Sequence, residues 1–280
     1  DNWLLKLDAS GNIVSQKTFG GTGNDSPTSV RPTADGGYVA GGISNSNTSG
    51  DKTEDGLGGF DFWIQKFAPE GTLLPAEALD FDGTDDQVTL APLPVSPDFT
   101  LEYWLYAKTP DDDYDRITSV VGDVFETAKS GGSEIRMLTY PDGWQVVTSV
   151  PVDEWAHLAF VKEGTSVKVY QNASLVYTGT TSLAGLPSQW YLGARWVGND
   201  GAAGIEAANM ALDELRIWGT ALSQTQIQNR MNCELTGAQP YLVAYYNMNQ
   251  GIAGGNNPTE TVLTDSSPNE ADGALANFAL

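Results

Sequence analysis

Residues 78–105 read ALDFDGTDDQVTLAPLPVSPDFTLEYWL, and this stretch decides the fold class. Hydrophobic and polar residues alternate in Val88–Leu90 and again in Phe99–Leu105, and this period of two predicts strands of a sheet with one buried face. Glycine, proline and aspartate lie before and between these strands, where they favour turns. Because the following residues continue in short strand-like runs, we expect an all-β sandwich that begins near residue 78.

The composition limits the kinds of partner. The 280 residues carry 36 acidic and 14 basic side chains, which gives a net charge of −22. Such a field repels phosphate backbones, so nucleic-acid binding is not expected, whereas carboxylate oxygens suit Ca²⁺. No apolar run is long enough to span a bilayer, so membrane insertion is not expected either. The single cysteine, Cys233, excludes an intrachain disulfide, and the length predicts about two domains.

The first seventy residues contain an internal repeat. DNWLLKLDASG at residues 1–11 and DFWIQKFAPEG at residues 61–71 share Asp, Trp, Lys and Gly at a spacing of 60 residues. Between them, a D-G-G-Y sequence predicts a hairpin turn, and residues 45–59 form a polar, glycine-rich loop. A period of this length with four short strands is typical of a propeller blade. The loop residues Asp51, Glu54 and Asp55 are candidate cation ligands, with a solvated loop as the alternative.

This repeat resembles those of bacterial secreted proteins that are read as propeller blades. The resemblance covers residues 1–71, so we expect a partial β-propeller-like repeat there, then a linker at 72–77 and a second domain at 78–280. Because one repeat cannot bury both its faces, it would pack on the sandwich, pack on further blades or remain loose. The chain opens within a repeat, so we expect it to be a segment of a longer protein.

Strand-like runs recur through the rest of the chain. The expected strands are Glu134–Tyr140, Trp144–Ser149, Trp155–Lys162, Ser166–Gln171, Leu175–Gly179, Trp190–Trp196, Met210–Trp218 and Tyr241–Asn249. A helical pattern is found in Ser223–Asn232, with Ser223 as a plausible N-cap and with Ile227 and Met231 four residues apart. Strands at this spacing, separated by turn residues, predict an antiparallel sandwich.

Five motifs carry a resemblance to a known family. In chain order they are ALDFDGTDDQVTL, FTLEYWLYA, EWAHLAFVKEGTSVKVYQNASLVYTG, YLGAR and MALDELRIWGTALSQTQI. Together they resemble the laminin-G-like, concanavalin-A-like jelly-roll domain, which implies an antiparallel jelly-roll β-sandwich. The tail, at residues 240–280, resembles a segment that accompanies such domains, and it would either complete this sandwich or begin the next unit. Asn172-Ala173 stands where the family usually has Asn-Gly, which leaves the turn type open.

The strongest candidate site is a calcium site. Several aspartates crowd the loop before the first strand, and Asp213 begins the DELRIW motif. In resembling jelly rolls, this loop and the aspartate of the late motif can share a calcium ion, so the resemblance implies Asp82, Asp86 and Asp213 first, and then Asp85, as ligands. The alternative is a solvated acidic turn, in which Asp213 caps a backbone end or forms an ion pair with Arg216.

Exposed aromatic side chains are candidate sugar-binding groups, because the C–H face of a sugar ring stacks on them. The candidates near strand ends or loops are Trp144, Trp190, Trp196 and Tyr114. The residues that lie within alternating runs, and are expected in the core, are Trp104, Trp155 and Trp218. Arg195, Trp196 and Asn199 form the best polar and aromatic loop, in which polar groups would bind hydroxyls while Trp196 stacks. A core position is the alternative for any single Trp.

Catalysis is not expected. Concanavalin-like glycosidases carry Glu-x-Asp-x-Glu on one strand face, because acid and nucleophile must face each other across the sugar, and that spacing is absent from this sequence. His157 is interpreted as structural, since no second histidine exists for a relay or zinc site. Cys233 is interpreted as a buried thiol. Asp111–Asp115 does not begin an EF-hand, because the sixth position is Arg116 instead of Gly.

These patterns predict a secreted or cell-surface module for adhesion or carbohydrate binding, assisted by calcium. The resemblance implies a long, repetitive bacterial surface protein of the type IX-exported kind. Its partners would be a glycan or a surface protein, together with neighbouring domains of the same chain. This functional prediction rests on an analogy with proteins of the same fold. Two alternatives stay open: a structural spacer of a filament or stalk, and a non-catalytic accessory domain of a secreted polysaccharide-degrading enzyme.

Overall fold

The computed structural model divides the chain into two compact units, Asp1–Leu73 and Leu74–Leu280. It describes residues 2–7, 13–32, 38–52, 54–67, 78–109, 114–131, 133–195, 206–235, 239–250 and 260–278. The described elements are strands and one short helix, so the predicted all-β class is confirmed. The predicted linker at 72–77 lies outside the described residues. Within the described part of the chain, no helix has the length and apolar character needed to cross a membrane.

The first unit contains two small antiparallel sheets. The pairs are β1 (Asn2–Leu7) with β2 (Ile13–Phe19), and β3 (Asp25–Pro32) with β4 (Tyr38–Ser44) and β5 (Asp61–Phe67). Phe19 and Ala40 form its buried apolar cluster, against which Leu4, Tyr38 and Trp63 pack. These sheets do not establish a propeller blade, which stays a prediction. The D-G-G turn at residues 35–37 lies outside the described residues.

A lysine organises the acidic loop of the first unit. The buried Lys52 Nζ donates a hydrogen bond to the Ser46 carbonyl at 2.6 Å. Asp51 accepts from the Gly20 N–H, and Asp55 accepts from the Thr48 N–H and hydroxyl. Two of the three carboxylates that sequence reasoning offered to a cation, Asp51 and Asp55, therefore serve as hydrogen-bond acceptors for protein groups, which favours the alternative without a metal.

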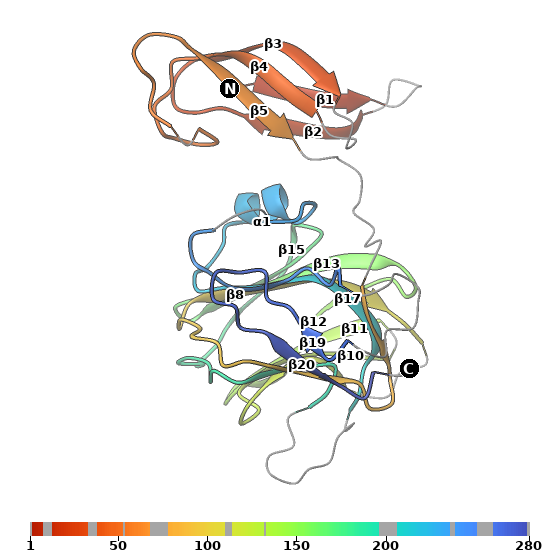
Figure 1. Cartoon of the computed structure of the whole chain (residues 1–280). Coiled ribbons are helices and arrows are strands. Elements are labelled where there is room, and N and C mark those ends of the chain that lie inside the picture. Colours follow the sequence, from red (N-terminus) through yellow and green to blue (C-terminus); the bar gives the residue numbers. More distant parts are fainter. Residues whose placement is uncertain are drawn as a thin grey trace. The chain divides into compact units, whose positions relative to one another are not determined.

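The second unit is a sandwich of two sheets whose strand pairs are antiparallel (Figure 1). The eight-stranded sheet has the order β12-β11-β10-β9-β16-β7-β20-β19. Its strands are β7 (Gln87–Leu90), β9 (Asp115–Val120), β10 (Phe125–Ser130), β11 (Glu134–Thr139), β12 (Gly143–Ser149), β16 (Trp190–Leu192), β19 (Val262–Leu263) and β20 (Gly273–Ala276).

The seven-stranded sheet has the order β15-β14-β13-β8-β17-β18, and β6 also pairs with β17. Its strands are β6 (Leu79–Asp82), β8 (Phe99–Ala107), β13 (Trp155–Glu163), β14 (Ser166–Gln171), β15 (Ser174–Thr180), β17 (Asn209–Trp218) and β18 (Leu242–Tyr246). The core between the two sheets holds side chains from both, among them Leu101 and Tyr103 of β8 and Trp190 of β16. The predicted sandwich is therefore confirmed.

Strand β8 is buried on both faces, so the expectation of one solvent-facing side is wrong for this strand. Leu101 and Tyr103 enter the core between the sheets, while Glu102 and Trp104 on the opposite face are also buried. The physical reason is a second layer. The segment after β17 folds back over this face, and the Trp104 indole N–H donates to the Met231 carbonyl at 2.7 Å.

The second layer is built on helix α1 (Gln224–Arg230), whose N-cap was predicted correctly. Ser223 and Gln226 form a capping box, in which each side chain satisfies an otherwise unpaired backbone N–H of the other. Ile227 is the buried residue of the helix, and it joins an apolar cluster with Trp218 and Tyr170 of the sheet. Figure 1 shows α1 on the outer side of the sheet that contains β13 and β8.

The strands β9 and β10 were not predicted, because polar residues occupy them. The Thr118 and Thr127 hydroxyls lie 2.8 Å apart, and Lys129 pairs with Asp115 at 2.9 Å inside the fold. These partners satisfy each other, so the strands lack the alternation that sequence reasoning uses. The acidic run 111–113 lies outside the described residues.

The strand expected at Trp190–Trp196 ends early, at Leu192. Gly193 follows with a φ of +79°, a backbone conformation that glycine adopts without strain. A Cβ at this position would lie 2.2 Å from the Phe81 ring, so the close approach also requires glycine. The chain therefore turns out of the sheet at Gly193.

The described part of the tail completes this sandwich, which is the first of the two alternatives for it. Strand β18 pairs with β17, and β20 pairs with β7. Asp265 is buried and accepts four hydrogen bonds: from the Tyr245, Ser267 and Ala271 N–H groups at 2.8 Å and from the Ser267 hydroxyl at 2.7 Å. The D-S-S-x-N sequence thus holds the outer edge of β18.

We predict that Asp265→Asn lowers the free energy of unfolding by about 2 kcal/mol, because the amide nitrogen would face buried N–H donors that need an acceptor. Chemical denaturation at pH 7 measures the loss. Glu270→Gln removes the same charge from an exposed position in the same loop and is the matched control. Equal stability of the two variants would contradict the structural role of Asp265.

Candidate functional site

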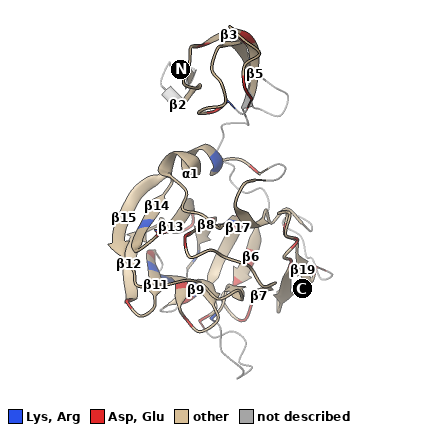
Figure 2. Cartoon of the chain, turned by 90° about the vertical axis from the view of Figure 1, so that its left-hand side faces the viewer, with Lys and Arg blue, Asp and Glu red and all other residues tan. Residues whose placement is uncertain are grey.

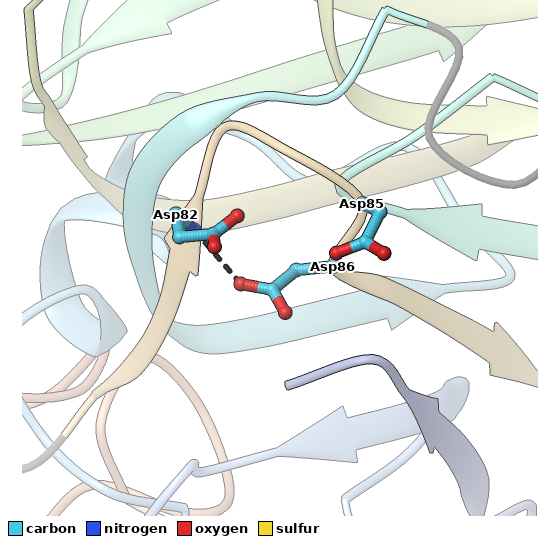
Figure 3. A group of neighbouring side chains, drawn as sticks. All are labelled: Asp82, Asp85 and Asp86. Atoms are coloured by element: carbon cyan, nitrogen blue, oxygen red, sulfur yellow. Dashed lines mark hydrogen bonds between the residues drawn. The ribbon is translucent and has the colours of Figure 1, made fainter. Parts of the chain in front are cut away.

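Three carboxylates meet in the loop between β6 and β7. One oxygen from each of Asp82, Asp85 and Asp86 lies within 4.8 Å of the others. Figure 3 shows the Asp86 carboxylate turned toward the backbone of Asp82, whose N–H donates to Asp86 Oδ2 at 2.8 Å. The structure therefore brings together three of the four predicted metal ligands, on a loop that also offers carbonyl oxygens.

Asp86 is the most informative member of this group. Its exposed fraction is 3%, and its Oδ1 atom is buried with no hydrogen-bond partner among the described residues. Burial raises the pKa of Asp86 to about 6, and the charges of Asp82 and Asp85 act in the same direction. A buried anionic oxygen without a donor is costly, and a bound cation would remove that cost.

The neighbouring contacts fix the loop around Asp86. Asp82 Oδ1 accepts the Thr84 N–H at 2.7 Å, and Asn277, after β20, donates to the Asp85 carbonyl at 3.0 Å. Asp80 belongs to another interaction, since it forms an ion pair with Lys108. Among the described residues, the group that could hold a cation is thus the three clustered aspartates.

The structure places the fourth predicted ligand, Asp213, elsewhere, and this corrects the ligand set. In the β17 ladder Asn209 is opposite Asp82, whereas Asp213 is opposite Trp104 of β8, roughly 13 Å further along a strand. Asp213 is 4% exposed, and burial, followed by the charge of Glu214, raises its pKa to about 8. The DELRIW motif belongs to the layer under α1.

A second group of functional candidates lies on the outer face of the eight-stranded sheet, where β9, β11 and β12 belong to one layer (Figure 2). Trp144 of β12 packs against Tyr114, with ring centroids 5.3 Å apart. The Arg116 guanidinium lies 4.7 Å from the Trp144 ring centroid, and Arg136 lies 4.8 Å from that of Tyr114. The result is a half-buried aromatic pair held between two arginines.

Arg195 joins this group through carboxylates. It pairs with Asp123 at 2.6 Å and lies 3.9 Å from Glu206, which itself pairs with Arg116 at 2.9 Å. Arg195 and Trp144 were predicted separately, and the structure connects them through Glu206 and Arg116. Because each of these arginines has an acidic partner, the described part of this face has no excess of positive charge for an anionic ligand.

Sequence reasoning missed acidic members of this network, among them Glu206, Glu126 and Asp123. Glu126 pairs with Arg116 at 2.6 Å and is buried, and its Oε1 atom has no hydrogen-bond partner among the described residues. Burial raises the pKa of Glu126 to about 7, with Asp123 acting in the same direction. The available signal was the F-E-T-A-K-S sequence, in which the charged residues Glu126 and Lys129 each stand directly beside small residues.

The other aromatic candidates have different outcomes. Trp190 is wrong as a ligand contact, because it has 0% exposure and packs against Phe125 in the core. Trp196 and Asn199 lie outside the described residues. The core predictions for Trp104 and Trp218 are confirmed, whereas Trp155 is half-buried beside Tyr106. The contacts that a ligand could reach therefore centre on Arg195 and the Tyr114–Trp144 pair.

The loop that holds Asp82, Asp85 and Asp86 is adjacent to the face that holds Arg195. A Cβ added at Gly193 would lie 3.0 Å from the Asp86 carbonyl, so the two backbones are in close approach. Arg195 follows two residues after Gly193. A change in the position of the Asp86 loop would therefore move the backbone that carries Arg195.

The buried carboxylates under α1 have internal partners. Glu102 accepts the Trp218 indole N–H at 2.9 Å, and the Tyr245 hydroxyl donates to Glu214 at 2.7 Å. His157 is also buried there, with Nε2 located 3.5 Å from Glu102. Cys233 is half-buried instead of buried, with its sulfur 3.4 Å from the Arg230 carbonyl.

The model of the concanavalin A-like lectin/glucanases superfamily matches residues 82–228, more than half of the chain. The chain belongs to this superfamily. The resemblance carried by the five strand motifs is thus confirmed. A search of curated proteins gives no match.

Solved structures with a similar fold are found as well. A Bacteroides ovatus ATCC 8483 protein, to which carbohydrate binding is ascribed, matches with a TM-score of 0.61 and 15% identity over 87% of this chain and 68% of its own. Domain 4 of a GH43 extracellular arabinanase from Geobacillus stearothermophilus, in complex with arabinotriose, matches with a TM-score of 0.42 and 20% identity over 68% and 86%. The Limulus polyphemus SAP-like pentraxin matches with a TM-score of 0.47 and 16% identity over 54% of this chain and 79% of its own. The first match shows a shared fold.

We predict that Asp213→Asn raises the free energy of unfolding at pH 8 and changes it little near pH 4. The pKa of Asp213 in the folded state, about 8, lies above the ordinary value near 4, so ionisation favours the unfolded chain. Protonated Asp213 therefore stabilises the folded wild type near pH 4, and this contribution to the free energy of unfolding is lost as the pH rises from about 4 to about 8. The asparagine of the variant does not ionise, so the variant has no such loss.

Urea unfolding across this pH range measures the effect. Asp86 and Glu126 shift in the same direction, so the variant should flatten the profile only in part. Asp153→Asn, at an exposed position, is the control and should follow the wild type. A parallel profile for Asp213→Asn would contradict the assignment.

Proposed function

We propose that this chain is a calcium-assisted carbohydrate-binding module, and that the sugar binds the outer face of the eight-stranded sheet at Arg195 and Trp144. The observation that carries this proposal is the convergence of Arg195 with the Tyr114–Trp144 pair through one ion-pair network. Membership of the concanavalin A-like superfamily and the carbohydrate binding ascribed to the Bacteroides protein support it.

The chemistry of this face suits a neutral sugar. An aromatic ring offers a stacking surface for the C–H groups of the sugar, and Arg195 together with Asp123 offers donors and acceptors for its hydroxyls. Trp196 and Asn199, which follow Arg195 in sequence, are proposed to extend the same site. Since the arginines of the face have acidic partners, an uncharged glycan needs no further charge compensation.

The proposed calcium ion would be held by Asp82, Asp85 and Asp86. Its role would be indirect: it would supply the positive charge that the unpartnered Asp86 oxygen lacks, and it would fix the loop that contacts Gly193. The backbone leading to Arg195 would then have one position instead of several. Calcium would thus support sugar binding without contact with the sugar.

For the setting, we propose a secreted or cell-surface location, in a long repetitive bacterial surface protein of the type IX-exported kind. The acidity of the chain and the 60-residue repeat of the first unit support this setting. The partners would be a glycan or a surface protein, together with neighbouring domains. The spacer and the accessory domain of a polysaccharide-degrading enzyme are the competing proposals, and a spacer would bind no glycan.

We predict that Ca²⁺ raises the melting temperature relative to protein in EDTA, because an ion that binds only the folded state stabilises it by about 2.7 kcal/mol at 100 times its Kd. Asp86→Asn should abolish the calcium-dependent shift. Asp80→Asn, in the adjoining strand β6 and paired to Lys108, should retain it. No shift in the wild type, or an equal shift in Asp86→Asn, would rule out the proposed ion.

We predict that wild-type protein gives glycan-array signals that Arg195→Gln and Trp196→Ala each reduce at least tenfold, a loss of about 1.4 kcal/mol in binding free energy. Trp3→Ala removes an exposed Trp from the first unit and should leave the signals unchanged. Circular dichroism of each variant checks that the sandwich stays folded. A blank wild-type array would favour the spacer, whereas full signal in both variants would place the sugar elsewhere.

A further inference from the structure

The repeat of the first unit places two tryptophans at equivalent sequence positions but in different environments. Trp63 of β5 packs in the apolar cluster, with its ring 5.9 Å from that of Phe19 and with Ala40 in the same cluster. Trp3 of β1 is its equivalent at a spacing of 60 residues, and 63% of it is exposed. Trp3 therefore lacks contacts equivalent to those that Phe19 and Ala40 make with Trp63.

The two equivalent strands bury opposite faces. In β1, Leu4 packs on the Phe19–Ala40 cluster while Trp3 and Leu5 are exposed. In β5, Trp63 packs on that cluster, while Phe62 and Ile64 are 93% and 72% exposed. Because successive residues of a strand point to opposite faces, this strand type carries an apolar surface on each side.

A strand with two apolar faces suits a position between two units. In repeat proteins, each unit buries its surface against its neighbours. The Leu4 face of β1 already contacts the cluster of the unit that follows it in sequence. Trp63 contacts the Phe19–Ala40 cluster, which precedes it in sequence. By analogy, the Trp3 face would contact the equivalent cluster of a unit that precedes Trp3. The expected contact thus continues an interface that the unit already contains.

We propose that Trp3 and Leu5 form a docking face for another unit of this same 60-residue repeat, joined on the N-terminal side. The residues of that unit equivalent to Phe19 and Ala40 would cover Trp3 as Phe19 and Ala40 cover Trp63. A separate complete copy of the chain fits less well, because its own Trp63 already occupies the place on its cluster. This inference concerns a surface outside the proposed sugar and calcium sites.

The test adds one period to the whole protein, by placing residues 1–60 directly before Asp1. The product contains two copies of Trp3, of which the terminal copy is an internal exposed reference. After trypsin digestion the interior copy lies on a distinct peptide, which begins after Lys52 of the added unit. Hydroxyl-radical footprinting with mass spectrometry should label the interior Trp3 several-fold less than the terminal one, and about as weakly as Trp63.

Two variants of the added unit sharpen the result. Phe19→Ala in that unit should raise labelling of the interior Trp3 to the level of the terminal copy. Leu57→Ala there removes a side chain that is 98% exposed and should leave the protection intact. Equal labelling of the two Trp3 copies in the unmutated tandem protein would overturn the proposal, and so would an added unit that stays unfolded as judged by protease sensitivity.

Discussion

Glu102 is a carboxylate at the centre of β8 with no exposed surface, and the second unit depends on how its charge is compensated. Burial alone would raise its pKa, but the nearby His157 imidazole and the charge of Arg216 outweigh burial and hold the pKa below its usual range. Arg216 lies 3.6 Å from Glu102 and also donates to the Arg230 carbonyl at 2.8 Å, at the end of α1. One guanidinium thus connects the central strand to the layer that covers it. Removing one partner of such a group would leave an uncompensated buried charge, which is more costly than losing an exposed ion pair.

This compensation decides which surfaces remain for ligands. Because α1 and the following segment cover the outer face of β8 and β17, the carboxylates of the DELRIW motif are internal and contact protein groups. The outer face of the eight-stranded sheet is different. Its arginines and acids form ion pairs around a half-buried aromatic pair, and several of these groups reach the surface, among them Arg195, Asp123 and Arg136. The asymmetry between the two faces is why we place the sugar on one sheet and interpret the polar network of the other as structural.

The two halves of the proposed site share one backbone constraint. Gly193 has a positive φ and lies against the Phe81 ring and the Asp86 carbonyl, so a side chain there would displace one of them. Phe81 and Asp86 flank the acidic loop, and Arg195 follows the glycine. The position of the loop and the position of Arg195 are therefore coupled through packing, which gives a cation in the loop a physical route to influence the sugar face. Such coupling needs contact between neighbouring backbones and no change elsewhere in the fold.

The sequence by itself determined the all-β class, most strands of the sandwich, the Ser223 cap of α1 and the acidic loop, because alternation, turn residues and capping are local signals. It also predicted correctly that Trp104 and Trp218 are buried. Only the tertiary structure decided that Asp213 lies away from Asp86, that Trp190 is internal and that Glu206 and Arg116 join Arg195 to Trp144. It likewise placed the tail beside β7 and found β9 and β10. The reason is physical: register between distant strands, and cover by a layer that folds back later in the chain, arise from contacts between residues far apart in sequence, and no local period records them.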